Sequence, residues 1–557
     1  MSTRLAVAIV PLVLLSLGVQ ALFLASPDQS GLPLDDGWIH ATYARNLARH
    51  GCLCLNPGEP STGTTSFLWT GLLAALHAVG LGPVAAPIAW GLPLQACLIT
   101  LVFLLARDAR LGDGWAFLAA ASCAALGTLV WISLAGMEAT LFLVLGLGAL
   151  WCRARRWLLA AGALAGLLVL ARPEGGALAV TLALAEIPAA RRRRARGPKA
   201  VTPLARRWLK LFGPVALAVG IYLGINLAIS GQVLTATFAG RRWLAGQPAG
   251  IDLSPLAVFD GAAALATAWG RYLYRWVFGM GLLAWLGVGA AAVAGGVLAA
   301  VFGLLAAGGV LRVALAARRD RGTPSPLLLL FGWALIHNAA YAVLLPVHGH
   351  AGRYQAVNFV VLAVGVTAGT AWLARARSSV RRLAPVLVAA WMALCLGSTA
   401  LWRVIYRDSV HHIHTTHVAC GRWIADHLPS DAVVATYDLG AVAYHADRRV
   451  VDLGGLVDPA MARHLFAGDC APYLRDQGAT HLAMVQHALD DTHLLGALGL
   501  WPPAPGSPAL RPLQHWSVPP ERYHLHHVAT SNAAPCMVLY RLDWPGADAV
   551  RSAAFRP

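Results

Sequence analysis

Charged residues are scarce in this sequence. Asp, Glu, Lys and Arg make up 12% of the 557 residues, whereas hydrophobic residues make up 58%. With a mean hydropathy of +0.61, this composition excludes a soluble globular protein of this size. Several apolar runs are long enough to cross the hydrocarbon core of a bilayer, which takes about 20 residues. The chain is therefore predicted to be an all-α polytopic membrane protein over most of its length.

Nucleotide-binding motifs are also missing. No GxGxxG or P-loop pattern follows a predicted strand. Internal repeats, which are typical of many secondary transporters, are not evident either. The net charge of +17 could suggest a nucleic-acid partner. Because the arginines are distributed between apolar runs and do not form one basic face, membrane lipids are the expected partner and nucleic acid is not.

The arginine clusters define the predicted topology, because cytoplasmic loops of membrane proteins are rich in Arg and Lys. The clusters are Arg107 and Arg110; Arg153, Arg155 and Arg156; Arg191 to Arg194 with Arg196; Arg206 and Arg207; Arg318 and Arg319; and Arg375, Arg377, Arg381 and Arg382. Arg4 precedes the first apolar run, so the N-terminus is predicted to be cytoplasmic.

About eleven transmembrane helices follow from this assignment. The predicted spans are 5–25, 87–106, 114–134, 138–152, 157–172, 174–190, 211–229, one within 277–311, 326–345, 355–374 and 384–401. The apolar run 67–80 is too short to cross comfortably and would also reverse the sidedness of the later clusters. It is predicted to be a re-entrant or interfacial helix. The threading of 277–311 stays open.

Two domains are predicted. Residues 1–401 form the transmembrane domain, and residues 402–557 form an extracytoplasmic (periplasmic) α/β domain outside a bacterial cytoplasmic membrane. The short β-type runs VVAT, RRVVDL, THLAMV and CMVLY alternate with helix-like stretches in this tail.

Cysteine and histidine patterns give weak predictions. Cys470 and Cys536 lie on the predicted outer side, where disulfides can form, and a bridge between them is plausible. The pairing as a whole stays open. We expect no metal site at Cys52 and Cys54, nor in the histidine group His411, His412, His414 and His417.

Ionisable residues gather at the predicted outer ends of the spans. Charges at membrane depth are costly and usually face a cavity or each other, so these residues are functional candidates. They are Asp35 and Asp36 after the first span; Glu138 in AGMEATLF; Arg172 and Glu174 in LARPEGG; and His348, His350, Arg353 and Tyr354 in HGHAGRYQ.

These blocks together resemble a known family. LDDGWIHATYARNLARHG followed by LNPGEPSTGTTSFLWTGLLAAL resembles the start of GT-C fold glycosyltransferases, especially the mycobacterial terminal arabinofuranosyltransferase branch. AGMEATLF, LARPEGG, HGHAGRYQ and TYDLGAVAYHADRRVVDLGGLVDP resemble later blocks of the same branch, in the same order. The block LTATFAGRRW resembles one that ends in a basic residue, matched by Arg241 or Arg242.

The resemblance implies a GT-C fold and transfer of a monosaccharide from a polyprenyl-phosphate donor. Inversion at the anomeric carbon follows if one base drives a direct displacement. Arabinofuranose is the first expectation for the sugar, with mannose or another hexose next; the acceptor would be an envelope glycan, glycolipid or exported protein. Asp35, or its close rival Asp36, would be the general base. Donor phosphate and sugar would be bound by Arg353, with His348, His350, Tyr354, Arg172, Glu174, Glu138, Arg45 and Tyr43 as further candidates. No cofactor is required, and the use of a divalent cation stays open.

The main alternative is a polytopic lipid or sugar transporter or flippase, in which the acidic residues would couple proton movement. A non-enzymatic lipid receptor is a third reading, and it would not need the pair Asp35 and Asp36.

Overall fold

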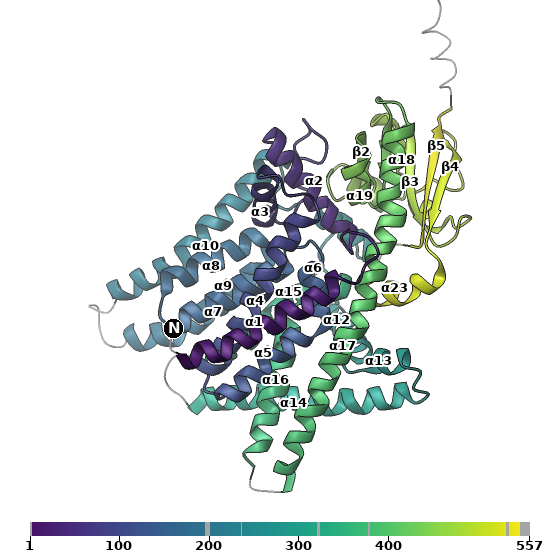
Figure 1. The fold of residues 1–557 in the computed structure, drawn as a ribbon. Coiled ribbons are helices and arrows are strands. Elements are labelled where there is room, and N and C mark those ends of the chain that lie inside the picture. The colour runs from purple at the N-terminus through teal and green to yellow at the C-terminus, as the bar shows by residue number, and fades with distance from the viewer. Residues whose placement is uncertain are drawn as a thin grey trace, which may run out of the picture. The chain divides into compact units, whose positions relative to one another are not determined.

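The computed structural model describes residues 3–194, 201–235, 237–319, 324–376, 379–530 and 534–545. Arg196 and Arg377 of the predicted arginine clusters lie outside these residues. The described chain is mostly helical, with one five-stranded sheet near its C-terminus (Figure 1).

The chain forms two compact units, each built from segments that are distant in sequence. The first unit contains Met1–Ser26, Ile88–Tyr222 and Asp252–Tyr406, and the second contains Pro27–Pro87, Leu223–Ile251 and Arg407–Pro557. The second unit thus holds the C-terminal tail together with two earlier segments. One of those segments carries the pair Asp35 and Asp36.

Three helices, α4, α10 and α17, contain residues of both units. Every other helix of the first unit lies entirely within its residue ranges. The elements that contribute to the first unit are α1 (Thr3–Leu24), α4 (Ala85–Asp108), α5 (Asp113–Ala125), α6 (Gly127–Leu134), α7 (Ala139–Ala154), α8 (Leu158–Ala171), η1 (Pro173–Gly175), α9 (Gly176–Arg194), α10 (Val201–Ser230), α12 (Pro255–Trp276), α13 (Met280–Trp285), α14 (Ala291–Arg319), α15 (Pro326–Leu344), η3 (His350–Gln355), α16 (Val357–Ala374), η4 (Ser379–Leu383) and α17 (Ala384–Ile413).

The membrane-spanning character of the first unit is clear, although eleven crossings stay a prediction. Within the described residues, seven helices are long and apolar enough to cross a membrane, or eight if the pair α5 and α6, bent by 58°, forms one span. Helices α7 and α8 have 16 and 14 residues, shorter than the about 20 that a straight crossing needs. They correspond to the predicted short spans 138–152 and 157–172.

The glycine-rich region 277–311 resolves into a short helix, α13, and the start of the long apolar helix α14. Helix α14 packs closely against α16 through small residues. A Cβ atom added to Gly309 would lie 2.1 Å from the backbone oxygen of Gly365, so glycine permits this approach.

Helix α12 was not among the predicted spans. Its buried residues recur every three or four positions, which is the pattern of an amphipathic helix: Gly261, Leu265, Trp269, Tyr272 and Trp276. Because Asp260, Arg271 and Arg275 interrupt the segment, it lacks the continuous apolar run by which the other helices were identified.

The second unit combines helices from three regions of the chain with the sheet. Its helical elements are α2 (Asp35–His50), α3 (Phe67–Ala78), α11 (Thr237–Leu244), the π-helical segment η5 (His414–Val418), α18 (Ala419–His427), α19 (Gly440–His445), α20 (Met461–Ala467), α21 (Ala471–Asp476), α22 (His493–Ala497), η6 (Pro520–Arg522) and α23 (His524–Thr530). Helix α3 has 12 residues, which agrees with a helix too short to cross.

The sheet has the strand order β2-β1-β3-β5-β4, with parallel pairing of β1 to β2 and β3 and antiparallel pairing of β5 to β3 and β4. Register pairs include Val434 with Val450 and Met484 with Val538. The strands are β1 (Val433–Thr436), β2 (Arg449–Asp452), β3 (His481–Gln486), β4 (Ala509–Ser517) and β5 (Cys536–Asp543). An α/β domain in the tail is therefore confirmed.

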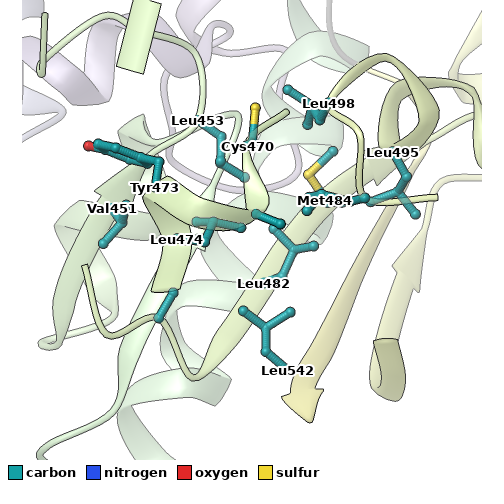
Figure 2. Packing of buried hydrophobic residues seen from close by; sticks show 14 of the residues in the cluster. Val451, Leu453, Cys470, Tyr473, Leu474, Leu482, Met484, Leu495, Leu498 and Leu542 are labelled. Carbon is teal, nitrogen blue, oxygen red and sulfur yellow. The ribbon is translucent and has the colours of Figure 1, made fainter. Parts of the chain in front are cut away.

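Both faces of the central strands are buried, which explains their nearly continuous apolar sequences. On one face Leu482, Met484 and Leu542 pack with Leu474 and Leu495 (Figure 2). On the other face Val434, Ala483 and Leu539 pack against α18 and α19 through Ile424 and Val442.

Strand β4 was missed by the sequence analysis. Its residues are mostly exposed on both faces, and Pro512 interrupts it at a register shift. No alternating apolar pattern can arise in such an edge strand, whereas β1, β2, β3 and β5 match the four predicted runs.

The predicted Cys470–Cys536 bridge is wrong, because both cysteines are buried and unbonded. A disulfide instead joins Cys52 and Cys54 in the loop between α2 and α3. Cys470 packs in the apolar core beside Leu474 and Leu498, so its role is that of a small core residue (Figure 2).

Candidate active site

The candidate residues divide between the two units. Asp35, Asp36, Tyr43 and Arg45 belong to the second unit. The others belong to the first: Glu138, Arg172, Glu174, His348, His350, Arg353 and Tyr354.

Asp35 is the first residue of α2 and is held by the start of α19. Its two carboxylate oxygens accept the backbone N–H groups of Gly440 and Ala441, each at 2.8 Å. A Cβ atom on Gly440 would lie 2.1 Å from the backbone oxygen of Asp35, so this approach requires glycine. The motif TYDLGA therefore positions the acid through its main chain.

Burial raises the pKa of Asp35 to about 6, and the negative charge of Asp438 acts in the same direction. The two amide hydrogen bonds and the nearby His417 oppose this rise without cancelling it. A carboxylate with such proton affinity can accept a proton near neutral pH more readily than an exposed aspartate.

Asp36 has a different environment. Its Oδ2 atom lies 3.1 Å from a guanidinium nitrogen of Arg241, and its side chain is 18% exposed. Arg242 instead donates to the backbone oxygens of Pro248 and Gly250. The structure thus distinguishes two arginines that the sequence left equivalent: Arg241 contacts the acidic pair, and Arg242 holds its own loop.

His417 and Asp438 complete the acidic cluster, which we define as Asp35, Asp36, Arg241, His417 and Asp438. The Nε2 atom of His417 lies 3.1 Å from Oδ2 of Asp438, and His417 is fully buried. The sequence analysis did not select either residue. The signal that could have found Asp438 is its place in the block TYDLGA, which resembles a GT-C block; that block does not contain His417.

Tyr43 and Arg45 make contacts within the second unit. The Tyr43 hydroxyl lies 2.7 Å from Oγ of Ser61. Arg45 donates to the backbone oxygen of Tyr444 at 2.7 Å and stacks over its ring. In this structure both side chains join α2 to neighbouring segments, and their part in donor binding stays a prediction.

In the first unit, Arg353 lies in a tight turn between α15 and α16. Gly349, Ala351 and Gly352 adopt positive φ angles of 68°, 54° and 72°. Gly349 has no space for a side chain, since a Cβ atom there would lie 2.7 Å from the ring of Tyr354. The HGHAGRYQ block thus forms a compact turn that fixes the main chain around Arg353, which is itself buried.

Arg172 lies between two carboxylates. Its guanidinium is 3.2 Å from Glu174 and 3.6 Å from Glu138. It also donates to the hydroxyl of Tyr341 at 2.6 Å, and that hydroxyl donates to Glu174 at 2.5 Å. The structure thus brings Arg172, Glu174 and Glu138 together, with Tyr341 as an additional member, and their part in donor binding stays a prediction.

The ring of Tyr354 joins the two arginines. The guanidinium carbons of Arg172 and Arg353 lie 5.2 Å and 5.4 Å from its centroid. Tyr341 stacks on Tyr354 at 5.7 Å. We call this set, Glu138, Arg172, Glu174, Tyr341, Arg353 and Tyr354, the arginine cluster.

One histidine of the same block contacts two further aromatic rings. His348 packs between Trp269 and Tyr272, with centroid distances of 6.3 Å and 5.1 Å. His350 begins η3. Their part in phosphate binding stays a prediction.

An apolar cavity of about 990 Å³ lies in the first unit between α9, α12, α14, α15 and α16. Its wall includes Leu265, Leu335 and Trp269. The indole of Trp269 donates to Gln355, two residues after Arg353. The cavity therefore adjoins the segment that carries the arginine cluster.

Among the residues that the structure describes, no group of three or more His, Cys, Asp or Glu side chains is arranged to hold a metal ion.

Comparison with known proteins supports the fold. Residues 405–540 match a family model described as a domain of unknown function (DUF8728). No curated protein matches the chain. Among solved structures, ArnT from Cupriavidus metallidurans bound to undecaprenyl phosphate is similar, with 14% identity, a TM-score of 0.51, and coverage of 97% of this chain and 98% of ArnT.

Two further structures are similar at lower scores. The apo state of the same ArnT has 15% identity and a TM-score of 0.47, covering 95% of this chain and 97% of ArnT. Mycobacterial arabinofuranosyltransferase AftD has 17% identity and a TM-score of 0.45, covering 97% of this chain and 42% of AftD. The likeness to lipid-bound ArnT shows that this chain has the polytopic GT-C membrane fold expected from its sequence.

Proposed function

We propose that this protein is a membrane glycosyltransferase that moves a monosaccharide from a polyprenyl-phosphate donor to an acceptor hydroxyl. The single observation that carries the proposal is the buried carboxylate of Asp35, oriented by two backbone amides and with its pKa raised to about 6. A hydroxyl is a weak nucleophile, and a positioned base of this kind contributes about 10²–10⁴-fold to such a transfer.

The proposed step is a direct displacement. The acceptor oxygen forms a bond to the anomeric carbon while the bond from that carbon to the phosphate oxygen breaks. The acceptor proton passes to Asp35, and the polyprenyl phosphate leaves with the electron pair. One displacement inverts the anomeric configuration, because retention through a double displacement would require a second nucleophile.

We assign different roles to the two aspartates because their environments differ. Asp35 is the base, since burial favours its protonated form. The charge of Asp36 is balanced by Arg241, so this pair is suited to orienting the hydroxyls of the acceptor.

The arginine cluster is proposed to bind the donor phosphate. Arginine offers several fixed donors that match phosphate oxygens. Arg353 is the first candidate, because the tight turn of the HGHAGRYQ block fixes its main chain and places its buried guanidinium beside the ring of Tyr354. The adjoining apolar cavity of about 990 Å³ is suited to part of the polyprenyl chain.

The fold of ArnT, which was solved with undecaprenyl phosphate, supports a lipid-phosphate donor. Arabinofuranose is the first proposal for the sugar, with mannose or another hexose next. The acceptor is proposed to be an envelope glycan, a glycolipid or an exported protein, at the outer face of a bacterial cytoplasmic membrane. No cofactor is proposed. Dependence on a divalent cation is tested in the assay by adding EDTA.

The test uses the purified protein in lipid nanodiscs with polyprenyl-phosphate-linked arabinofuranose, mannose and glucose in parallel. Mass spectrometry of added envelope glycan should show one new terminal sugar from one donor, with release of polyprenyl phosphate, in the presence and absence of EDTA. A deletion strain should lack the same terminal sugar. If labelled lipid instead crosses proteoliposome membranes with no covalent product, the protein is a flippase and the proposal is wrong.

A further inference from the structure

A buried histidine lies at an irregular point of the backbone beside the acidic pair. His417 belongs to the π-helical segment η5, between α17 and α18, and its side chain has no exposed surface. Short π-helical segments inside α-helices are often found at functional sites. In this fold the irregular turn places the imidazole between the main chain of η5 and Asp438.

The hydrogen bonds around Thr416 indicate where the protons of this imidazole are. The Thr416 hydroxyl donates to the backbone oxygen of His412 at 2.7 Å. It has one hydrogen, and a carbonyl oxygen can only accept. Its second contact, 2.7 Å to Nδ1 of His417, is therefore satisfied when Nδ1 carries a hydrogen and donates to the hydroxyl oxygen.

The other ring nitrogen faces a carboxylate. Nε2 of His417 lies 3.1 Å from Oδ2 of Asp438, and an ionised carboxylate only accepts hydrogen bonds. With hydrogens on both nitrogens, His417 is a cation, and the pair that it forms with Asp438 has no net charge. A neutral imidazole would supply one hydrogen fewer, and one of three contacts, Thr416 to His412, Thr416 to His417 or His417 to Asp438, would lack a hydrogen.

A neighbouring histidine shows the opposite pattern. Nε2 of His412 lies 3.1 Å from the backbone oxygen of Ala534, so this nitrogen carries a hydrogen. Its Nδ1 accepts from Nε2 of His526 at 3.0 Å. Each ring then has one hydrogen, and both histidines are neutral. The ring centroids of His412 and His417 are 5.8 Å apart, so His412 serves as a neutral reference for the charge of His417 in the same buried site.

The charges around Asp35 show what this cation can do. The charged or titratable groups that interact with His417 in the described structure are Asp438, Asp35 and the ring of His412. Asp35 is buried, and its charge is otherwise stabilised by the amides of Gly440 and Ala441. A positive charge nearby favours the ionised form of a buried carboxylate, and the negative charge of Asp438 opposes it.

We propose that His417 is a doubly protonated positioning residue which, paired with Asp438, keeps Asp35 ionised and able to accept the acceptor proton. This inference rests on the proposed function, because it assigns a control on the same base. It also links catalysis to the C-terminal domain, which supplies Asp438 and the amides that hold Asp35.

The first experiment measures the charge of His417 and does not depend on activity. The exchange of the imidazole Cε1 hydrogen for deuterium changes rate as a histidine is protonated, and peptide mass spectrometry of the wild-type protein gives this rate across a pH series. We expect His417 to be mostly protonated at neutral pH and His412 to be mostly neutral. Equal titration of the two histidines, or a neutral His417, would overturn the proposal even if sugar transfer is observed.

The second experiment uses two nearly isosteric variants with opposite expected effects. His417→Gln removes the cation, so the pKa of Asp35 should rise. The acidic limb of the pH profile, where the transfer rate increases as Asp35 ionises, should therefore move to higher pH by about one unit. Asp438→Asn removes the opposing anion, while the amide oxygen of Asn can still accept the Nε2 hydrogen of His417 and hold the cation, so the limb should move to lower pH. Loss of packing alone would lower the rate in both variants without moving the limbs in opposite directions.

Two controls separate this role from general damage. Thr416→Ser keeps the hydroxyl that accepts from Nδ1 and should retain the wild-type limb. His412→Asn changes a neutral neighbour and should also leave the position of the limb unchanged. If His417→Gln and Asp438→Asn both keep the wild-type limb, His417 does not control the base. If wild-type protein transfers no sugar, the proposed function fails, and the exchange experiment still decides the charge of His417.

Discussion

Asp35 accepts a hydrogen bond from the backbone amide of Gly440 at 2.8 Å, although the two residues are 405 positions apart in the chain. The partner of the acid is thus a main-chain group at the start of α19, and a side chain at position 440 would clash with the backbone oxygen of Asp35. The contact makes the geometry of the acidic pair depend on the folding of the C-terminal domain.

Gly440→Ala tests this dependence. The added Cβ atom would lie 2.1 Å from the backbone oxygen of Asp35, so α19 or α2 has to move. Overpacking of this kind lowers the free energy of unfolding by about 1–3 kcal/mol. We expect a lower midpoint in thermal unfolding and a strong loss of transfer. Gly224→Ala, which has no atom within 4 Å of the new Cβ, is the matched control and should behave as wild type.

Removal of the base is the second prediction. Asp35→Asn keeps the volume and should lower transfer by about 10²–10⁴-fold at normal protein level. Asp36→Asn should impair the enzyme mainly through acceptor binding, so its KM for acceptor should rise more than its kcat falls. Near-normal transfer by both single variants and by the double variant would show that the pair is not catalytic.

The pH dependence of transfer follows from the same residue. The pKa of Asp35 is raised to about 6, and only the ionised form can accept a proton. The wild-type rate should therefore rise as the pH increases through about 6 and then level off. The measurement is kcat at saturating donor and acceptor across this range, with a stability check at each pH. A flat profile between pH 5 and 7 contradicts the assignment of Asp35 as base.

The fourth prediction concerns Arg353. If its guanidinium binds the donor phosphate, Arg353→Lys loses part of a two-point contact and Arg353→Ala loses it all. A hydrogen bond to a charged group contributes about 1.5–3 kcal/mol, so the alanine variant should lose about 10- to 150-fold in kcat/KM for the donor. Acceptor binding should be spared. Arg155→Lys, which changes an exposed pair with Asp108, is the control. Full function in Arg353→Lys would indicate that this arginine has a packing or lipid-anchoring role.

Topology provides a fifth prediction. Reporter fusions or labelling of introduced cysteines should place Arg107 and Arg192 in the cytoplasm and Asp36, Glu138 and Arg353 on the outer side. This follows from the positive-inside rule. A cytoplasmic Glu138 would contradict both the topology and the assignment of the outer turns to the active site.

The sequence by itself determined the membrane character and four of the five strands, and the GT-C fold class followed from its resemblance to that family. The membrane character and the strands depend on local patterns: the length of an apolar run decides whether a helix can span a bilayer, and continuous apolar segments mark buried strands. The edge strand β4 and the amphipathic helix α12 lack such patterns, so they became visible only in the structure.

The tertiary structure decided how the candidate residues differ from one another. Asp35 and Asp36 are adjacent in sequence, yet one is buried against α19 and the other pairs with Arg241. Arg241 and Arg242 are likewise neighbours with different partners. His417 gains its partners from the π-helical turn and from Asp438. Hydrogen bonds and burial depend on which distant segments meet, and that information does not reside in the local pattern of a single chain segment.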